Sequence, residues 1–220
     1  MVRGGRLSAT AGLLYVVFML GFIAVLFTSG KVGSEDSQKL AWVSDNASRT
    51  GTGALLLGLA GISMLWFVGT LRVVLSRDEG QPERLSMLAF IGGAIYSTFL
   101  LLSSFFVEFA VISATIDKYA PAVAVSLALG ADLSFFSPGW AFPCSVLVWA
   151  TALVGARGNA FPRWLSWSSA GLAILLIASA AVTYISGALV ILLGLVLFLM
   201  WVLATSVVLL KSSTAAAEIV

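Results

Sequence analysis

Residues 187–210 read GALVILLGLVLFLMWVLATSVVLL and contain no charged side chain. A helix over this stretch is about 36 Å long at about 1.5 Å per residue, which exceeds the roughly 30 Å hydrocarbon core of a bilayer. Uncharged apolar runs of about 18 residues or more are typical of membrane-spanning helices. The stretch therefore predicts a helix that crosses a membrane.

Five further apolar runs of similar length precede this one. They cover residues 11–29, 53–74, 87–114, 134–154 and 165–183. Of the 12 basic and 10 acidic residues, only Arg72 and Glu108 fall inside the six runs, and a charge at bilayer depth costs at least about 2.5–3.5 kcal/mol. Because lipid offers the backbone no hydrogen-bond partners, continuous runs predict helices rather than strands. We expect an all-α bundle of six transmembrane helices in a single membrane domain over residues 1–220.

The composition indicates the same class of protein and excludes several kinds of chemistry. Hydrophobic residues make up 60% of the chain and charged residues 10%, against about 45–50% and about 25% in soluble domains. The lack of histidine excludes Ser-His-Asp triads, His-ligated haem and histidine zinc sites. The single cysteine, Cys144, is expected to pack as a small apolar residue. We expect no cofactor, no metal and, at a net charge of +2, no nucleic-acid partner.

The distribution of basic residues predicts the orientation of the helices. With the N-terminus in the cytoplasm, the inner side holds Arg3, Arg6, Arg72, Arg77, Arg84, Arg157, Arg163 and Lys211, and the outer side holds Lys31, Lys39, Arg49 and Lys118. Because basic residues favour the cytoplasmic side, this excess predicts that both termini lie inside. Trp164 and Trp167 at the inner end of the fifth run, and Trp140 at the outer end of the fourth, are typical of interfacial anchors.

Three segments of the chain leave alternatives open. Residues 11–29 are expected to remain as a span, and a cleaved signal peptide is the alternative. Residues 30–52 contain a helix-start signal at Ser34 and apolar residues at helical spacing, which predicts a short amphipathic helix on the outer membrane face. Residues 115–136 contain an apolar run too short to span, so this segment is expected to lie at the interface or over the mouth of the bundle.

Two similar pentapeptides lie 80 residues apart. Residues 82–86 read PERLS and residues 162–166 read PRWLS, and each precedes a predicted outward-running span. A parallel duplication of two spans, as in some transporters, is one interpretation. Coincidence or shared chemistry is the favoured one, because proline and serine suit helix starts and arginine and tryptophan suit the inner interface.

Glu108 is the most informative candidate site residue, because an ionisable group inside a span is by default a candidate for function. It lies about 30 Å along its helix from Met87 at about 1.5 Å per residue, near the outer edge of the hydrocarbon. This depth favours an interfacial or ion-paired glutamate without a chemical role. A contact with an ion, a proton or a ligand is the alternative. Tyr96 and Ser103, seven residues apart on one helix face, are then further candidate ligands.

Other polar residues are expected to have structural roles. Arg72 lies two residues from the inner end of its run and can extend its guanidinium group to the headgroups. Asp132 and Asp117 are candidates for an acidic outer rim that attracts cations, although a solvated loop is the favoured interpretation. The Pro-Gly pair at 138–139, together with Pro143, predicts a bent or delayed start of the fourth helix.

Four short pieces of the chain resemble a family of bacterial six-span membrane proteins that is defined only as a domain of unknown function. The pieces are AGLLY at 11–15, an outer loop with Asp or Asn before Arg49, residues 128–136, and PRWL at 162–165. The resemblance covers about residues 7–200. It implies a bacterial cytoplasmic membrane and the same six-helix layout, and it implies no activity and no site residues.

The sequence favours a non-enzymatic role, with no catalytic and no metal site. The scarcity of polar groups in the spans indicates an accessory or scaffold subunit with a membrane-protein partner, or a binder of a lipid or another lipophilic small molecule from the surrounding bilayer. The alternative is a small transporter or channel around Glu108. A membrane enzyme that uses Glu108, Asp117 and Asp132 ranks last, because no spacing motif brings these carboxylates together.

Overall fold

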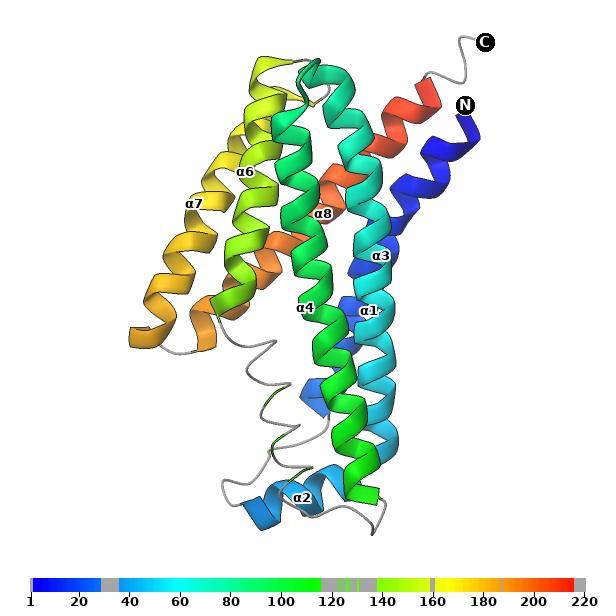
Figure 1. Cartoon of the computed structure of the whole chain (residues 1–220), viewed down its shortest axis with the longest axis vertical. Helices are drawn as coiled ribbons and strands as arrows, with labels where there is room; N and C mark the ends of the chain where they lie inside the picture. The colour runs from blue at the N-terminus through cyan, green and yellow to red at the C-terminus, as the bar shows by residue number, and fades with distance from the viewer. Residues whose placement is uncertain are drawn as a thin grey trace. The chain divides into compact units, whose positions relative to one another are not determined.

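The computed structural model describes residues 2–28, 36–115, 123, 126, 130, 138–158, 161–186 and 188–215. Its helices are α1 (Val2–Thr28), α2 (Asp36–Asp45), α3 (Ala47–Glu79), α4 (Arg84–Thr115), the 3-10 helix η1 (Pro138–Trp140), α6 (Ala141–Arg157), α7 (Arg163–Ser186) and α8 (Ala188–Ala215) (Figure 1). No strand occurs among these residues. The predicted all-α class is therefore confirmed for the part of the chain that the structure describes.

Five helices are long and apolar enough to cross a membrane. Their candidate spans are Thr10–Thr28, Ala47–Glu79, Arg84–Thr115, Arg163–Val182 and Val190–Lys211. Helix α6 is also apolar but has 17 residues, short of the roughly 20 residues of a usual span. The structure therefore shows a helical protein of multi-pass membrane type, with five candidate spans where the sequence predicted six.

The start of α6 differs from the predicted run 134–154. The α-helix begins at Ala141, after the 3-10 turn η1. Proline lacks an amide donor and disfavours regular helix around it, so the helix starts late, as the sequence predicted. Pro143 fits because it lies in the first turn of α6, where backbone amides have no acceptor within the helix. Residues 134–137 lie outside the described residues.

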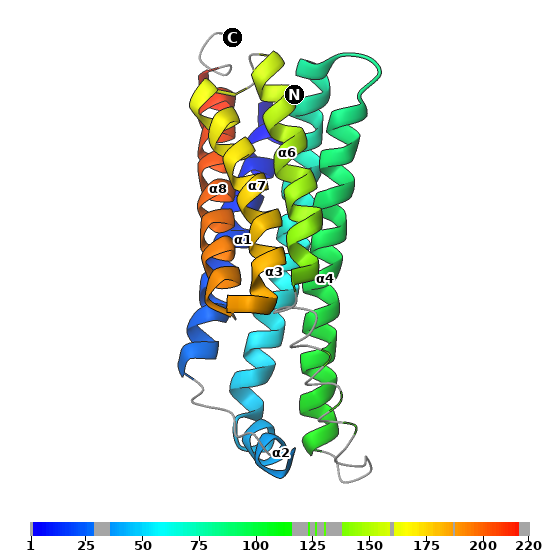
Figure 2. The ribbon, with the colours of Figure 1, turned by 90° about the vertical axis from the view of Figure 1, so that its left-hand side faces the viewer.

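The chain divides into two compact units. Unit 1 comprises Met1–Val16, Ser63–Ser97 and Pro138–Val220, and unit 2 comprises Val17–Ile62 and Thr98–Ser137. Helices α1, α3 and α4 contribute one segment to each unit. In unit 1, α6 packs against α7 and α7 against α8, and the three helices lie side by side in Figure 2. The single membrane domain stays a prediction.

Glycine allows close packing of α4 in unit 1. A Cβ atom on Gly92 would lie 2.6 Å from the carbonyl oxygen of Pro143 and 2.9 Å from the amide nitrogen of Leu147. Because both neighbours are backbone atoms of α6, no larger residue fits there. Gly93 faces Val68 of α3 at similarly short range. Small residues of this kind are typical of contacts between membrane helices.

Small residues also join α3 and α4 in unit 2. The Ser104 hydroxyl donates a hydrogen bond of 2.7 Å to the carbonyl oxygen of Ala54. A Cβ on Gly58 would lie 3.0 Å from the same hydroxyl oxygen, and one on Gly61 would lie 2.9 Å from Leu101. The two helix segments therefore pack through a glycine and serine surface.

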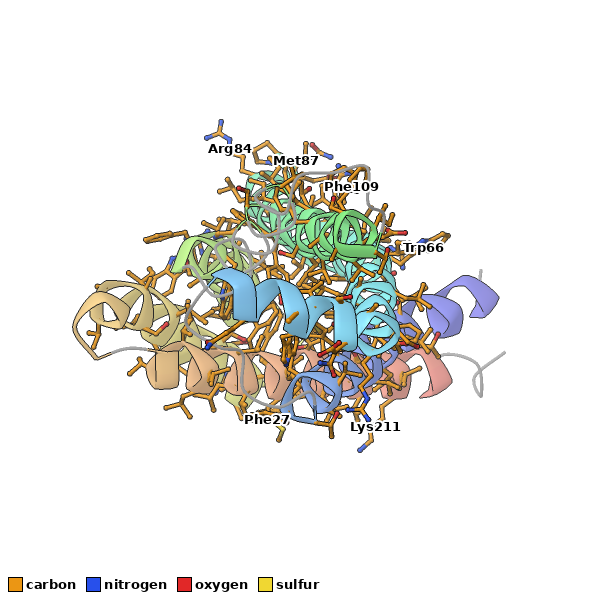
Figure 3. The ribbon with its side chains drawn as sticks, turned by 90° about the horizontal axis from the view of Figure 1, so that it is seen from below. Phe27, Trp66, Arg84, Met87, Phe109 and Lys211 are labelled. Atoms are coloured by element: carbon orange, nitrogen blue, oxygen red, sulfur yellow. The ribbon has the colours of Figure 1, made fainter. Side chains whose placement is uncertain are left out.

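Large apolar side chains face outward in both units. In unit 1, Trp66 is 68% exposed and Met87 is also exposed. In unit 2, Phe27 is 79% exposed and Phe109 is also exposed. Figure 3 shows these four side chains projecting outward from the ribbon. Large exposed apolar side chains suit contact with lipid tails or with another membrane protein.

A carboxylate closes the turn between α3 and α4. The two oxygens of Glu79 accept hydrogen bonds from the backbone N–H groups of Leu85 (2.7 Å) and Ser86 (2.8 Å). These amides lie in the first turn of α4, where they have no acceptor within the helix. Gly80 has a φ of 71°, a left-handed conformation that glycine adopts without strain. Glu79 therefore caps α4 with two charge-assisted hydrogen bonds.

The turn between α6 and α7 is built differently. The carboxylate of Asp78 in α3 lies so close to Gly158 that a Cβ on this glycine would collide with it. At the start of α7, the amides of Leu165 and Ser166 donate to the carbonyl oxygen of Pro162. Among the described residues, no carboxylate accepts a hydrogen bond from these amides. The start of α7 therefore has no acidic cap in this part of the chain.

Candidate functional site

Two tyrosines meet inside unit 1. Tyr15 comes from α1 and Tyr96 from α4, and their hydroxyl oxygens are 2.7 Å apart. The side chains are 0% and 1% exposed. A buried phenol needs a hydrogen-bond partner for its polar end, and each tyrosine is the partner of the other. The bond joins two helices whose tyrosines are 81 residues apart in the sequence.

Aromatic rings surround the tyrosine pair. Phe198 of α8 packs edge-on against both rings, with centroid distances of 6.4 Å to Tyr15 and 5.3 Å to Tyr96. Trp140 of η1 lies 5.9 Å from the ring of Tyr96, and Trp201 of α8 stacks on Phe198 at 5.8 Å. Favourable aromatic pairs contribute about 0.5–1.5 kcal/mol each beyond burial. These five residues, the aromatic cluster, therefore hold α1, α4 and α8 together.

A second hydrogen-bonded pair ties the aromatic cluster to α7. The indole N–H of Trp201 donates to the hydroxyl oxygen of Ser169 at 2.7 Å. The Ser169 hydroxyl in turn donates to the carbonyl oxygen of Leu165 at 2.6 Å. Both side chains are buried. The bonds fix the orientation of the indole ring, because Ser169 is itself held by its own helix.

The tyrosine pair retains one unused hydrogen-bond donor. Two phenols carry two O–H hydrogens, and only one of them is used in the bond between Tyr15 and Tyr96. Neither hydroxyl has a further acceptor among the described residues. A buried donor without an acceptor costs about 1–3 kcal/mol. The pair can therefore donate one more hydrogen bond, to a neutral acceptor in an apolar setting.

Four more buried hydroxyls of unit 1 have no partner within the described part of the chain. They belong to Ser97, Ser166, Thr205 and Ser206, and each side chain is at most 5% exposed. The hydroxyl oxygen of Ser206 lies beside Gly12 of α1, where a Cβ would collide with it. The polar groups of this interior are thus neutral hydroxyls, which suit neutral rather than charged ligands.

The hydroxyls of two predicted ligand residues are already engaged. Tyr96 lies in unit 1 and bonds to Tyr15. Ser103 lies in unit 2, where its hydroxyl donates to the carbonyl oxygen of Phe99 at 2.8 Å. The seven-residue spacing placed the two on one helix face, but each hydroxyl has a partner other than Glu108. Their predicted role as ligands beside Glu108 stays a prediction.

Glu108 is exposed on α4 in unit 2. Its neighbours Phe105 and Phe109 are also exposed, and their ring centroids are 4.5 Å apart. Among the described residues, Glu108 has no ion-pair or hydrogen-bond partner. The interfacial position expected from its depth stays a prediction. The other two candidates, Asp117 and Asp132, lie outside the described residues.

Two further sequence predictions can be compared with the structure. Cys144 is a free and fully buried thiol, which confirms its packing role. Arg72 is half-buried, and its guanidinium carbon lies 5.7 Å from the centre of the Phe90 ring. This distance is within reach of a cation–π contact. Arg72 thus packs its charged group on an aromatic face within unit 1.

Sequence reasoning found Tyr96 but missed its partner. Tyr15, Ser169 and Trp201 lie in apolar runs, and although Tyr15 ends the AGLLY piece at 11–15, no motif marks any of the three as a site residue. One signal was available: Tyr15 and Tyr96 are the only tyrosines inside the six predicted runs. Buried phenols need partners, so their pairing could have been expected. Nothing in the local sequence points to the bond between Trp201 and Ser169.

Comparisons of the chain with protein-family models, curated proteins and solved structures gave no match. The resemblance to bacterial six-span membrane proteins therefore stays a prediction. Within the described residues, no group of three His, Cys, Asp or Glu side chains could hold a metal ion. The aromatic cluster, with its neutral tyrosine pair, is the candidate functional site.

Proposed function

We propose that the chain is a non-enzymatic integral membrane protein that acts as an accessory or scaffold subunit or binds a lipophilic ligand. The observation that carries this proposal is the buried pair of Tyr15 and Tyr96, which is neutral, surrounded by aromatic rings and able to donate one more hydrogen bond. An apolar setting with a single oriented donor suits a lipophilic molecule that carries one acceptor. A packed aromatic core equally suits a rigid framework for a partner subunit.

We further propose six spans in a cell membrane, with both termini in the cytoplasm and α2 on the outer face. Helix α6 is about 26 Å long at about 1.5 Å per residue, and η1 adds roughly 6 Å at about 2 Å per residue. Together, at about 32 Å, they match the hydrocarbon thickness of about 30 Å. Within unit 1, the α3–α4 and α6–α7 turns lie at the same end (Figure 1) and carry Arg77, Arg84, Arg157 and Arg163. This basic end supports a cytoplasmic position.

Native mass spectrometry of the protein, gently extracted from its own membrane, tests the functional proposal. A double variant, Tyr15→Phe with Tyr96→Phe, removes both hydroxyls and keeps both rings, so that the pair has no donor left. Ser145→Ala is the matched control, because its buried hydroxyl donates only to Phe142 in its own helix. A lipophile held by the pair should be retained about tenfold less in the double phenylalanine variant, since one hydrogen bond of about 1.4 kcal/mol corresponds to that factor.

The outcomes of this measurement distinguish ligand binding from an accessory role. A lipophile lost in the double phenylalanine variant and kept in Ser145→Ala supports ligand binding at the pair. A stoichiometric protein partner that both variants retain supports the accessory role. A protein that is extracted with neither a partner nor a lipophile contradicts the proposal.

Cysteine labelling tests the proposed orientation. In a Cys144→Ala background, Asp45→Cys at the end of α2 should react with a membrane-impermeant maleimide in intact cells. Gln81→Cys, in the turn between α3 and α4, should react only after lysis. The reverse pattern would place the basic end of unit 1 outside the cell and contradict the orientation.

A small transporter or channel around Glu108 remains the alternative function. It is favoured by one observation, the exposed carboxylate of Glu108 without a partner among the described residues. The engaged hydroxyls of Tyr96 and Ser103 count against it. Solute or ion flux into liposomes that carry the protein, abolished by Glu108→Gln, would replace the accessory proposal with transport.

A further inference from the structure

Two exposed arginines flank the turn between α6 and α7. Arg157 is the last residue of α6 and Arg163 the first of α7. The two helices pack against each other and meet at one end of unit 1 (Figure 1). Neither guanidinium group has an ion-pair or hydrogen-bond partner in the described part of the chain. Two positive charges without a partner among the described residues therefore lie beside one turn.

The carboxylates at this end of unit 1 have other partners. Glu79 accepts from the first amides of α4, and Asp78 lies against the backbone of Gly158. Glu83 accepts a hydrogen bond of 3.2 Å from the side chain of Gln81. Among the described residues, no carboxylate forms an ion pair with either arginine of the α6–α7 turn. Their charges remain available to an external anion.

Two tryptophans and an apolar strip continue from this turn along α7. Trp164 is 57% and Trp167 is 76% exposed. Beyond them, a Cβ on Gly171 would meet nothing within 4 Å, and Ile174 is 61% exposed. Because Trp167, Gly171 and Ile174 are spaced by four and three residues, they lie on one face of the helix. The strip leads away from the arginines with open space in its middle.

We propose that Arg157, Arg163, Trp164 and Trp167 bind the headgroup of an anionic phospholipid whose acyl chain lies along the strip from Trp167 to Ile174. Guanidinium groups match the geometry of phosphate oxygens, and tryptophan prefers the headgroup level. Basic sites between helices at the cytoplasmic side are suited to anionic lipid headgroups. A lipid also accounts for the apolar strip next to the charges, which a soluble phosphate does not.

This inference goes beyond the proposed function and shares only its membrane setting and the proposed orientation. The functional test depends on Tyr15 and Tyr96, which lie in the aromatic cluster, whereas the lipid site depends on the two arginines of the α6–α7 turn. The failure of one proposal therefore leaves the other standing. The two sites have no residue in common.

The turn between α3 and α4 supplies a matched control. Arg77 and Arg84 are exposed arginines at the same end of unit 1, and the side chain of Arg84 projects away from the ribbon (Figure 3). The residues next to Arg84 in the sequence are Glu83 and Leu85, so no tryptophan flanks it. Removing Arg77 and Arg84 changes the net charge by the same two units as removing the proposed pair.

Native mass spectrometry of the full-length protein in detergent tests the site, with added phosphatidylglycerol or phosphatidylcholine of identical acyl chains. The unmodified protein should prefer phosphatidylglycerol about 10- to 30-fold, the factor expected for two basic residues near an anionic headgroup. Arg157→Gln with Arg163→Gln should reduce this preference to near unity. Arg77→Gln with Arg84→Gln should keep it.

Several results would overturn the proposal. One is an unmodified protein that binds phosphatidylglycerol and phosphatidylcholine equally well. Another is an equal loss of the preference in both double variants, which would show that net charge, and not a specific site, causes it. Displacement of the lipid by millimolar glycerol phosphate would identify a soluble phosphate as the ligand instead. Arg157→Lys with Arg163→Lys keeps the charge, so it should retain part of the preference. Should the double glutamine variant fail to fold, Arg163→Gln alone should give an intermediate value, and an unchanged value would contradict the site.

Discussion

The two turns at the basic end of unit 1 lead into helices whose first turns contain the same Leu-Ser pair, but they use their polar groups differently. In the α3–α4 turn, the Glu79 carboxylate accepts from the amides of Leu85 and Ser86. In the α6–α7 turn, the equivalent amides donate to the carbonyl oxygen of Pro162. The pentapeptides that look alike in the sequence therefore start their helices with different partners.

The side chains of the two turns differ in the same way as their backbone amides. The Ser86 hydroxyl donates to the carbonyl oxygen of Glu83, whereas the buried Ser166 hydroxyl has no partner among the described residues. Arg163 stands at the position that Glu83 has in the other pentapeptide. The first turn uses its polar groups to hold itself together, and the second leaves charges exposed. We infer that the first turn serves stability and the second serves recognition.

The largest expected effect is at Gly158, where the second turn has its tightest contact. Its backbone is extended, so alanine fits the conformation, but the new Cβ would collide with the Asp78 carboxylate. Gly158→Ala should lower the free energy of unfolding by about 1–3 kcal/mol, measured by SDS titration in detergent micelles. Asp78→Ala in the same chain should restore most of this loss. An equal loss with and without Asp78 would show that the contact is not responsible.

Removing the acidic cap of the first turn should have the next largest effect. Glu79→Ala leaves two amides of α4 without acceptors and should cost about 1–2 kcal/mol. Glu83→Ala is the matched control, because among the described residues that side chain bonds only to Gln81. Thermal unfolding of both variants in the same detergent compares them. Equal melting temperatures of Glu79→Ala and Glu83→Ala would show that Glu79 does not stabilise the start of α4.

The two equivalent serines should respond differently to the same substitution. Ser86→Ala removes a buried hydroxyl that has an acceptor and should cost about 0.5–1.5 kcal/mol. Ser166→Ala removes one that has none within the described residues, so stability should stay unchanged or rise. SDS titration of the pair tests this, and equal losses would mean that the two turns do not differ at this position.

The smallest expected effect has the opposite sign. Arg163→Glu places a negative charge at the start of α7, where the helix dipole favours it by about 0.3–1 kcal/mol at low ionic strength. The variant should therefore be slightly more stable than the unmodified protein while it loses the preference for phosphatidylglycerol. Thermal unfolding and native mass spectrometry of the same sample measure the two quantities. If the variant keeps its preference for phosphatidylglycerol, Arg163 is not part of the binding site.

Hydropathy predicted the positions of the long helices better than their ends. The apolar run 53–74 became α3 (Ala47–Glu79), because a helix continues past the hydrocarbon into polar residues that hydropathy does not mark. The run 87–114 matches α4 (Arg84–Thr115) closely, since Pro82 limits where that helix can begin. Helix α6 starts late because Pro138 and Pro143 disfavour regular helix at this point of the chain.

The candidate site was less predictable, because a charge stands out in an apolar run and a neutral phenol does not. Glu108 drew attention from the sequence, yet the aromatic cluster formed around Tyr15 and Tyr96. The pairing of residues so far apart depends on how α1 and α4 pack, which no local spacing encodes. The bond between Trp201 and Ser169 could not be predicted either, because it depends on how α7 and α8 pack.

The backbone contact at Gly92 restricts how unit 1 can move. With the backbone of α6 so close to this glycine, the two helix segments cannot rotate or slide past each other without separating. Tightly packed elements change arrangement as rigid bodies rather than by continuous deformation. Any motion that opens the aromatic cluster would therefore displace α1 or α8 and leave α4 and α6 joined.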